Sequence, residues 1–172
     1  MDPRLLPILA RERGARCPGL AGSGVRASLR ISTALLNEAI AAYAASASMV
    51  KEVFVTPRAA NHFDVRLKLA KPAFLPAFNI TVAIEQQPEL PANPVLVLHL
   101  TGAGGMLRLA GPAVTSSGML PPGVRLDADR VFIDVHEIAR HHGQAELLDY
   151  AEQLEVTTEE GSLILQLVAR VP

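Results

Sequence analysis

Residues 25–46 read VRASLRISTALLNEAIAAYAAS, and this stretch decides the fold because its periodicity changes from that of a strand to that of a helix. Over residues 25–31 apolar side chains alternate with Arg26, Ser28 and Arg30. A period of two is expected when one face of a sheet is buried. The sequence therefore predicts a first strand over residues 25–31.

A helix is predicted directly after this strand, over residues 33–46. Two hydroxyl side chains at the junction can cap the helix N-terminus. Leu36, Ile40 and Tyr43 recur at positions i, i+4 and i+7 through an alanine-rich segment, which gives the helix one apolar face. A second row of small and apolar residues widens this face, so we expect the helix to lie across a sheet.

The residues after this helix predict mainly antiparallel strands. The sharpest alternation lies in residues 53–69, where a turn at Asn61 predicts a hairpin. Residues 95–100 are apolar on both faces, which predicts a strand that is either sandwiched or covered on its outer side by a ligand or partner. Further strands are predicted over residues 78–84, 131–135, 154–158 and 163–171, the last two as a hairpin.

Two remaining segments are less regular. Residues 101–123 are rich in glycine and proline and are predicted to be a loop with short ordered pieces. Residues 136–153 predict a helical stretch that is interrupted at Gly143. Its second half, near residues 144–153, is the second helical segment of the fold.

Length and composition fit a single folded domain. The chain has 172 residues, of which 49% are hydrophobic and 19% charged, with a mean hydropathy of +0.26. Residues 14–24 are rich in glycine and alanine, so residues 1–24 are expected to form a flexible lead-in and residues 25–172 the domain. The expected fold class is α+β, with a curved antiparallel sheet wrapped around the long amphipathic helix.

Charge and composition exclude several classes of partner. Lys and Arg number 16 and Asp and Glu 17, so the net charge of −1 argues against nucleic acid. Trp is absent and aromatic residues are 4%, which argues against a carbohydrate platform. The apolar run near the N-terminus is broken by Pro7, so we expect neither a signal peptide nor a transmembrane segment, and a cytoplasmic location.

The sequence HEIARHH, residues 136–142, is the first candidate for chemistry. A zinc protease helix needs two histidines four residues apart on one helical face, and here the second one comes one residue late. A metal-dependent enzyme that uses His136, His141 and His142 is therefore kept only as a hypothesis. No metal site is predicted, and the three residues are interpreted as a solvated helix turn.

The glycine-rich segment TGAGGM, residues 101–106, follows a predicted strand as a phosphate-binding loop would. It lacks the sixth-position glycine of a dinucleotide fingerprint and the lysine of a P-loop, so it is interpreted as a turn. His99 is interpreted as a structural strand histidine, and Asp127 and Asp129 as solvated turn residues. No catalytic residue or cofactor is predicted, and a non-enzymatic role is expected.

The order of these elements resembles small bacterial members of the tubular lipid-binding (TULIP-like) superfamily, in which a curved sheet wraps a long helix. The residues that carry the resemblance are ISTALLNE at 31–38, the hairpin at 53–69 and LPPGVRL at 120–126. The resemblance covers residues 25–172 and implies lipid binding. The chain departs from the secreted relatives because it has no lipobox cysteine, which puts their envelope roles in doubt here.

The apolar content exceeds what one helix on a half-buried sheet requires. We therefore expect non-covalent binding of an acyl lipid or similar apolar small molecule in a groove between helix and sheet. The ligand-binding residues of this hypothesis are Leu36, Ile40, Tyr43, Val65, Leu67, Ile80 and Val82. The alternative is a protein-interaction or self-assembly module with a fully packed core and no ligand, in which a homo-oligomer hides the second apolar faces.

Overall fold

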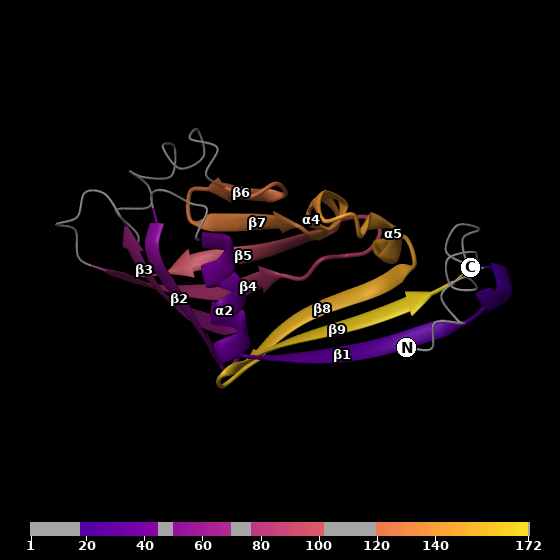
Figure 1. The fold of residues 1–172 in the computed structure, drawn as a ribbon, viewed down its shortest axis with the longest axis horizontal. Helices are drawn as coiled ribbons and strands as arrows, with labels where there is room; N and C mark the ends of the chain where they lie inside the picture. The colour runs from indigo at the N-terminus through magenta and orange to yellow at the C-terminus, as the bar shows by residue number, and fades with distance from the viewer. Residues whose placement is uncertain (1–17, 45–49, 70–76, 102–119, 172) are drawn as a thin grey trace.

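The computed structural model describes residues 18–44, 50–69, 77–101 and 120–171. These residues form two antiparallel sheets, one of three strands in the order β1-β9-β8 and one of six in the order β2-β3-β4-β5-β7-β6 (Figure 1). The short helices lie at the ends of strands. In Figure 1 the three-stranded sheet extends to the lower right, away from the six-stranded sheet.

The three-stranded sheet joins the two ends of the described chain. Its strands are β1 (Gly24–Ser32), β8 (Ala151–Glu159) and β9 (Ser162–Arg170). The register places Leu29 opposite Leu165, and Leu165 opposite Val156, so these side chains share one face. That face is apolar along most of its length because the alternation of all three strands is in phase.

The six-stranded sheet is built from successive hairpins. Its strands are β2 (Val50–Arg58), β3 (His62–Leu69), β4 (Phe78–Gln86), β5 (Val95–Thr101), β6 (Val124–Asp127) and β7 (Arg130–Asp134). Asn61, in the β2–β3 turn, has a φ of 61°. The register aligns Val55, Val65 and Ile80 on one face of the sheet. The opposite face carries mostly polar and charged side chains.

Buried apolar side chains come from both sheets. Phe63, Val82, Leu96 and Val97 are buried in the six-stranded sheet, and Ala151 and Val156 in the three-stranded sheet. Leu96 and Val97 point to opposite faces of β5, so this strand is covered on both sides, which is the first of the two alternatives that its sequence predicts.

Polar bonds join the two sheets at one end of each. The Gln87 side chain donates to the Val156 carbonyl at 2.7 Å and accepts from the Val156 amide at 2.8 Å. The Gly161 amide donates to the Pro57 carbonyl at 3.0 Å, and the Thr158 amide donates to Asn61 Oδ1 at 3.1 Å. The β8–β9 turn and the middle of β8 are therefore bonded to the β2–β3 hairpin and to the end of β4.

The helices are short. The first, α2 (Thr33–Ala44), has 12 residues and is about 18 Å long, and its main neighbour is β2. The others are α4 (Val135–His141) and α5 (Ala145–Leu148), which follow β7 in the chain, and a 3-10 turn, η1, at Pro18–Leu20. None of the described helices has the length and apolar composition needed to cross a bilayer.

The predicted fold class is wrong. The described chain is mostly β and forms two sheets, and neither sheet wraps around a long helix. Two physical reasons explain the difference. The helix is short and packs beside β2, an edge strand, while β8 and β9 pair with β1 instead of extending the larger sheet.

Most predicted strands and the 33–44 part of the predicted helix are present, but two assignments need correction. Residues 151–153 begin β8, so the second helical segment ends at Leu148. The sequence does not predict strand β6, because its four residues directly follow Pro-Pro-Gly, a sequence typical of loops. Most of the predicted loop over residues 101–123 lies outside the described residues.

Candidate functional site

The four predicted ligand-binding residues of the sheet lie on one face. Val65 stands opposite Ile80 in the register of β3 and β4, and Leu67 and Val82 lie at neighbouring positions of the same face. Val82 is buried at 5% exposure, whereas Val65, Leu67 and Ile80 are only half-buried. We call the surface formed by these four residues the apolar face.

The predicted helical residues lie beside this face, next to β2. Leu36 and Ile40 are half-buried on α2, and the Tyr43 side chain lies outside the described part of the structure. The Asn37 side chain fixes the helix to the edge of β2, since it donates to the Val55 carbonyl and accepts from the Val55 amide, both at 2.7 Å. Val55 is in turn paired with Val65.

Asn37 therefore attaches α2 to β2, the edge strand beside the apolar face. It also donates to the Thr33 carbonyl at 2.7 Å, so its amide is held from both sides. A buried or half-buried amide bonded in this way has one orientation. The helix is attached through the edge of the sheet, which leaves Val65 and Ile80 partly uncovered.

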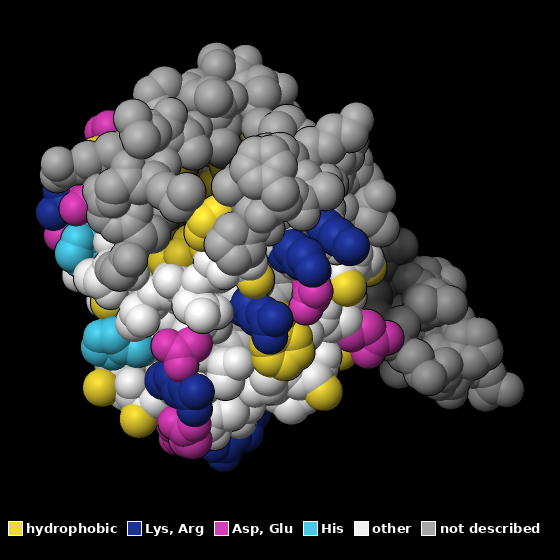
Figure 2. Space-filling view, turned by 90° about the vertical axis from the view of Figure 1, so that its left-hand side faces the viewer, with side chains coloured by type: hydrophobic (Ala, Val, Ile, Leu, Met, Phe, Trp, Pro, Cys, Tyr) yellow, Lys and Arg dark blue, Asp and Glu magenta, His cyan; other side chains and the backbone are white. Residues whose placement is uncertain are grey.

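A hollow of about 430 Å³ lies over strands β2, β3 and β4. It is lined mainly by side chains of the polar face, together with Val65 and Ile80. The lining residues are Phe54, Thr56, Asp64, Val65, Arg66, Asn79, Ile80 and Thr81. Phe54 is 46% exposed there. Figure 2 shows the end of the molecule at the left of Figure 1, where charged side chains of both signs are interspersed with isolated hydrophobic ones.

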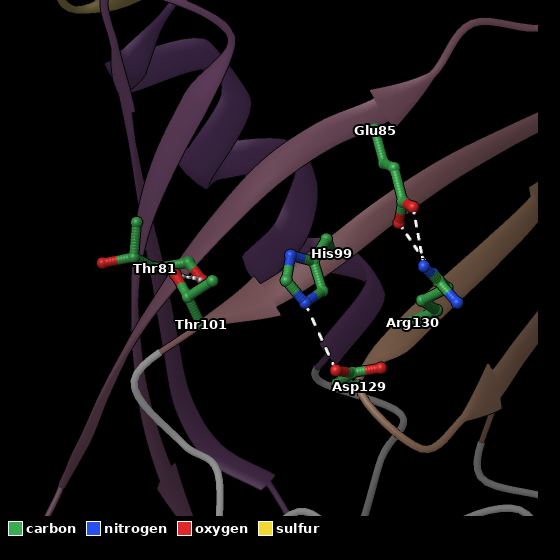
Figure 3. Close-up of polar contacts among 6 residues, drawn as sticks. All are labelled: Thr81, Glu85, His99, Thr101, Asp129 and Arg130. Atoms are coloured by element: carbon green, nitrogen blue, oxygen red, sulfur yellow. Dashed lines mark hydrogen bonds and ion pairs between the residues drawn. The ribbon is translucent and has the colours of Figure 1, made fainter.

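A cluster of polar side chains lies on the polar face of β4, β5 and β7 (Figure 3). Arg130 donates two hydrogen bonds to the Glu85 carboxylate, at 2.7 and 2.8 Å. His99 Nε2 lies 3.2 Å from Asp129 Oδ2. His99 and Arg130 are opposite each other in the register of β5 and β7, so the two pairs are neighbours.

The cluster shifts the pKa values of its acids in one direction. The hydrogen bond from Arg130 lowers the pKa of Glu85, and the hydrogen bond with His99 lowers the pKa of Asp129. Glu85 is exposed and Asp129 half-buried, and both are ionised near neutral pH. A histidine beside an aspartate can serve as a base, but the nearby Thr101 hydroxyl donates to the Thr81 carbonyl at 3.1 Å. The arrangement is that of cross-strand stabilisation.

A second hollow, of about 380 Å³, lies between the β4–β5 connection and the helices α4 and α5. His136 lies in it, with Nδ1 3.2 Å from an Arg140 nitrogen and Nε2 3.9 Å from Asp149 Oδ1. Asp134 caps α4 by accepting from the amides of His136 and Glu137. The polar groups of this hollow therefore bind mainly one another.

The three histidines of the metal hypothesis are not brought together as a ligand set. His141 and His142 stack edge to face with ring centroids 5.4 Å apart, and both are exposed at the end of α4. Within residues 18–44, 50–69, 77–101 and 120–171, no group of three His, Cys, Asp or Glu side chains is placed to hold a metal ion.

Two features of the structure escaped sequence reasoning. The His99–Asp129 contact depends on the pairing of β5 with β7, which local periodicity does not reveal. The Asn37–Val55 tie is the other, because an asparagine in a helix gives no signal that it will bond a strand edge. A polar residue on the otherwise apolar side of a helix is the sequence pattern that can indicate a hydrogen bond of this kind to a neighbouring strand.

The described residues define a mainly β protein of two antiparallel sheets, with half-buried Val65, Leu67 and Ile80 on one face of the larger sheet. Comparison with protein-family models, with curated proteins and with solved structures finds no match for this chain.

Proposed function

We propose that this protein binds an acyl lipid or a similar apolar ligand against the apolar face, beside α2. The observation that carries the proposal is the incomplete burial of Val65, Leu67 and Ile80, which a closed core would cover. Leu36 and Ile40 on the neighbouring helix are half-buried as well. The helix is attached at the edge of β2, so a ligand chain can lie over the face without displacing it.

The energetics favour a ligand with a long apolar chain. Burial of a methylene group contributes about 0.8 kcal/mol, so a 16-carbon chain gains roughly 12 kcal/mol before the costs of association and chain ordering. Micromolar binding is therefore expected without a dedicated polar contact. Such a site needs no sequence motif, in keeping with the absence of a catalytic or phosphate-binding pattern.

The direct experiment measures binding of a fluorescent 16-carbon fatty acid to the purified chain. Ile80→Asn places a polar amide on the apolar face, and we expect it to weaken binding by about tenfold. Thr81→Asn is the matched control, because it changes the next residue of the same strand on the opposite face, and its affinity should equal that of the parent chain. Leu36→Asn makes the same test from the helix if the sheet variant is unstable.

The outcomes separate ligand binding from general stickiness. Native mass spectrometry of the purified protein should show a bound lipid that is lost in Ile80→Asn and retained in Thr81→Asn. Equal affinity of both variants for the fatty acid, or repeated absence of any ligand, would contradict the proposal.

The second candidate function is a protein-interaction module, and it stays a prediction. The observation that favours it is the exposure of β1, where Val25 and Leu29 are 63% and 56% exposed. Isolated exposed apolar residues are ordinary, but here both lie on the edge strand of the three-stranded sheet, which pairs on one side only, with β9.

A further inference from the structure

The two sheets have four edge strands among the described residues. These are β1 and β8 in the three-stranded sheet, and β2 and β6 in the six-stranded sheet. An edge strand presents unpaired backbone N–H and C=O groups, which another chain can bond unless something covers them.

Two of the long edges each have one residue whose backbone N–H and C=O are both bonded by a side-chain amide. Gln87 bonds both backbone groups of Val156 on β8, at 2.7 and 2.8 Å. Asn37 does the same for Val55 on β2, at 2.7 Å for each bond. The remaining edge of the larger sheet, β6, has only four residues.

The outer edge of β1 has no bond of the kind seen on β8 and β2 to any residue within 18–44, 50–69, 77–101 and 120–171. The strand has nine residues, all of them exposed except Ile31. β1 lies along the lower margin of the three-stranded sheet in Figure 1.

The register identifies the open backbone groups. The Thr33 amide donates to the Gly161 carbonyl at 3.0 Å. In an antiparallel pair, every second residue from there along β1 points its backbone N–H and C=O toward β9, and the residues between them point theirs outward. In the middle of β1, the outward-facing N–H and C=O groups therefore belong to Arg26, Ser28 and Arg30. An added strand would bond these three residues.

The positive charge of β1 determines which kind of strand can pair with it. Arg30 forms an ion pair with Glu159, and Arg26 has no ion pair with any described residue. A second copy paired antiparallel along the full strand, centred on Ser28, places Arg26 opposite Arg30, and like charges in direct opposition are destabilising. An acidic strand places opposite charges there instead.

We infer that β1 accepts an added strand from another protein, namely an extended segment in which acidic residues alternate with apolar ones. The main-chain groups of Arg26, Ser28 and Arg30 provide the hydrogen bonds, and the two guanidinium groups select acidic side chains. Val25 and Leu29, on the other face, contact the apolar residues of the added strand. This surface is separate from the apolar face and does not depend on lipid binding.

The probe is a synthetic peptide, Thr-Val-Glu-Val-Thr-Val-Glu-Val-Thr, matched to the nine residues of β1. In antiparallel alignment its two glutamates lie opposite Arg30 and Arg26. We expect it to bind the full chain about tenfold more tightly than the same peptide with lysine in place of glutamate, measured by fluorescence anisotropy. Hydrogen exchange at the amides of Arg26, Ser28 and Arg30 should slow when the acidic peptide binds.

Ser28→Pro tests the strand itself. It removes an outward N–H without removing a bond to β9, and proline is tolerated at such edge positions. We expect peptide binding to be lost, whereas Ser28→Thr, which keeps the N–H, should bind as the parent chain does. Arg26→Glu should abolish the preference for the glutamate peptide, since each peptide then faces one like and one opposite charge, with Arg66→Glu on the other sheet as the matched charge control.

Three results would overturn the inference. One is equal binding of the two peptides, and another is unchanged binding in both Ser28→Pro and Arg26→Glu. The third is a dimer in light scattering that Ser28→Pro converts to a monomer, since the occupant would then be a second copy. If Ser28→Pro does not fold, as judged by circular dichroism, the comparison of Arg26→Glu with its control Arg66→Glu tests the inference.

Discussion

At the scale of single residues, polar side chains on this protein mostly bind one another across strands. Arg130 and Glu85 form a two-bond ion pair from β7 to β4, across the intervening strand β5, and His99 contacts Asp129 beside it. These groups are exposed, so each pair stabilises the fold only modestly. Both pairs lower the pKa of their carboxylate, Glu85 or Asp129, and this shift can be measured.

Replacement of Arg130 by glutamine should raise the pKa of Glu85 back toward its ordinary value of 4.5. Because the folded-state pKa is lowered, the ion pair stabilises the fold fully above the ordinary value. Its contribution is lost as the pH falls through the lowered value. An NMR titration that follows the Glu85 carboxyl carbon gives this pKa in the parent chain and in the Arg130→Gln variant.

Arg125→Gln is the control for this titration, since the Arg125 guanidinium stacks over the Phe132 ring and is not the ion-pair partner of Glu85. It should leave the Glu85 titration unchanged. A Glu85 carboxyl that titrates at its ordinary pKa in the unmodified chain would show that the ion pair does not persist in solution.

At the scale of elements, local pattern predicts hairpins well and distant pairing poorly. The β2–β3 and β8–β9 hairpins follow from alternation around a turn. The β1–β9 pairing joins residues more than a hundred positions apart, and nothing in either strand indicates that they form a separate sheet. For the same reason the sequence predicts an apolar face from Val65 and Ile80 but not which element covers it.

The junction of β6 with α4 gives a test at this scale. Gly123 has a φ of +81°, and a Cβ added there would lie 2.9 Å from the Asp134 carbonyl oxygen and 3.0 Å from an Ile138 side-chain carbon. Gly143 also has a positive φ, +67°, but has open space around it. Gly123→Ala should therefore be clearly more destabilising than Gly143→Ala.

The expected magnitudes follow from backbone strain and overlap. Gly143→Ala should cost about 1 kcal/mol for the left-handed conformation alone, and Gly123→Ala roughly 2 kcal/mol more because backbone atoms must move. Urea unfolding of the two variants measures the difference. Equal costs would mean that β6 and α4 do not pack as closely as the structure shows.

At the scale of the whole molecule, the two sheets are joined at one end by a few polar bonds and buried side chains. Gln87 is the clearest of these connections because its amide closes the β8 edge from the larger sheet. Gln87→Ala should cost about 2 kcal/mol of unfolding free energy, since two backbone groups lose their bonds. Gln86→Ala, an exposed residue one position earlier, should change stability by less than about 0.5 kcal/mol.

Hydrogen exchange locates the effect of Gln87→Ala. The Val156 amide should lose protection strongly, while amides in the middle of β4 keep theirs. Uniform loss of protection across both sheets, or none at Val156, would contradict the view that this amide closes the edge.

The partly uncovered apolar face is the central claim for function, and methyl NMR with a 16-carbon fatty acid tests it most directly. The account predicts intermolecular nuclear Overhauser effects between the acyl chain and the methyl groups of Val65, Leu67 and Ile80. An acyl chain that contacts none of these methyl groups, or that does not bind at all, would contradict it.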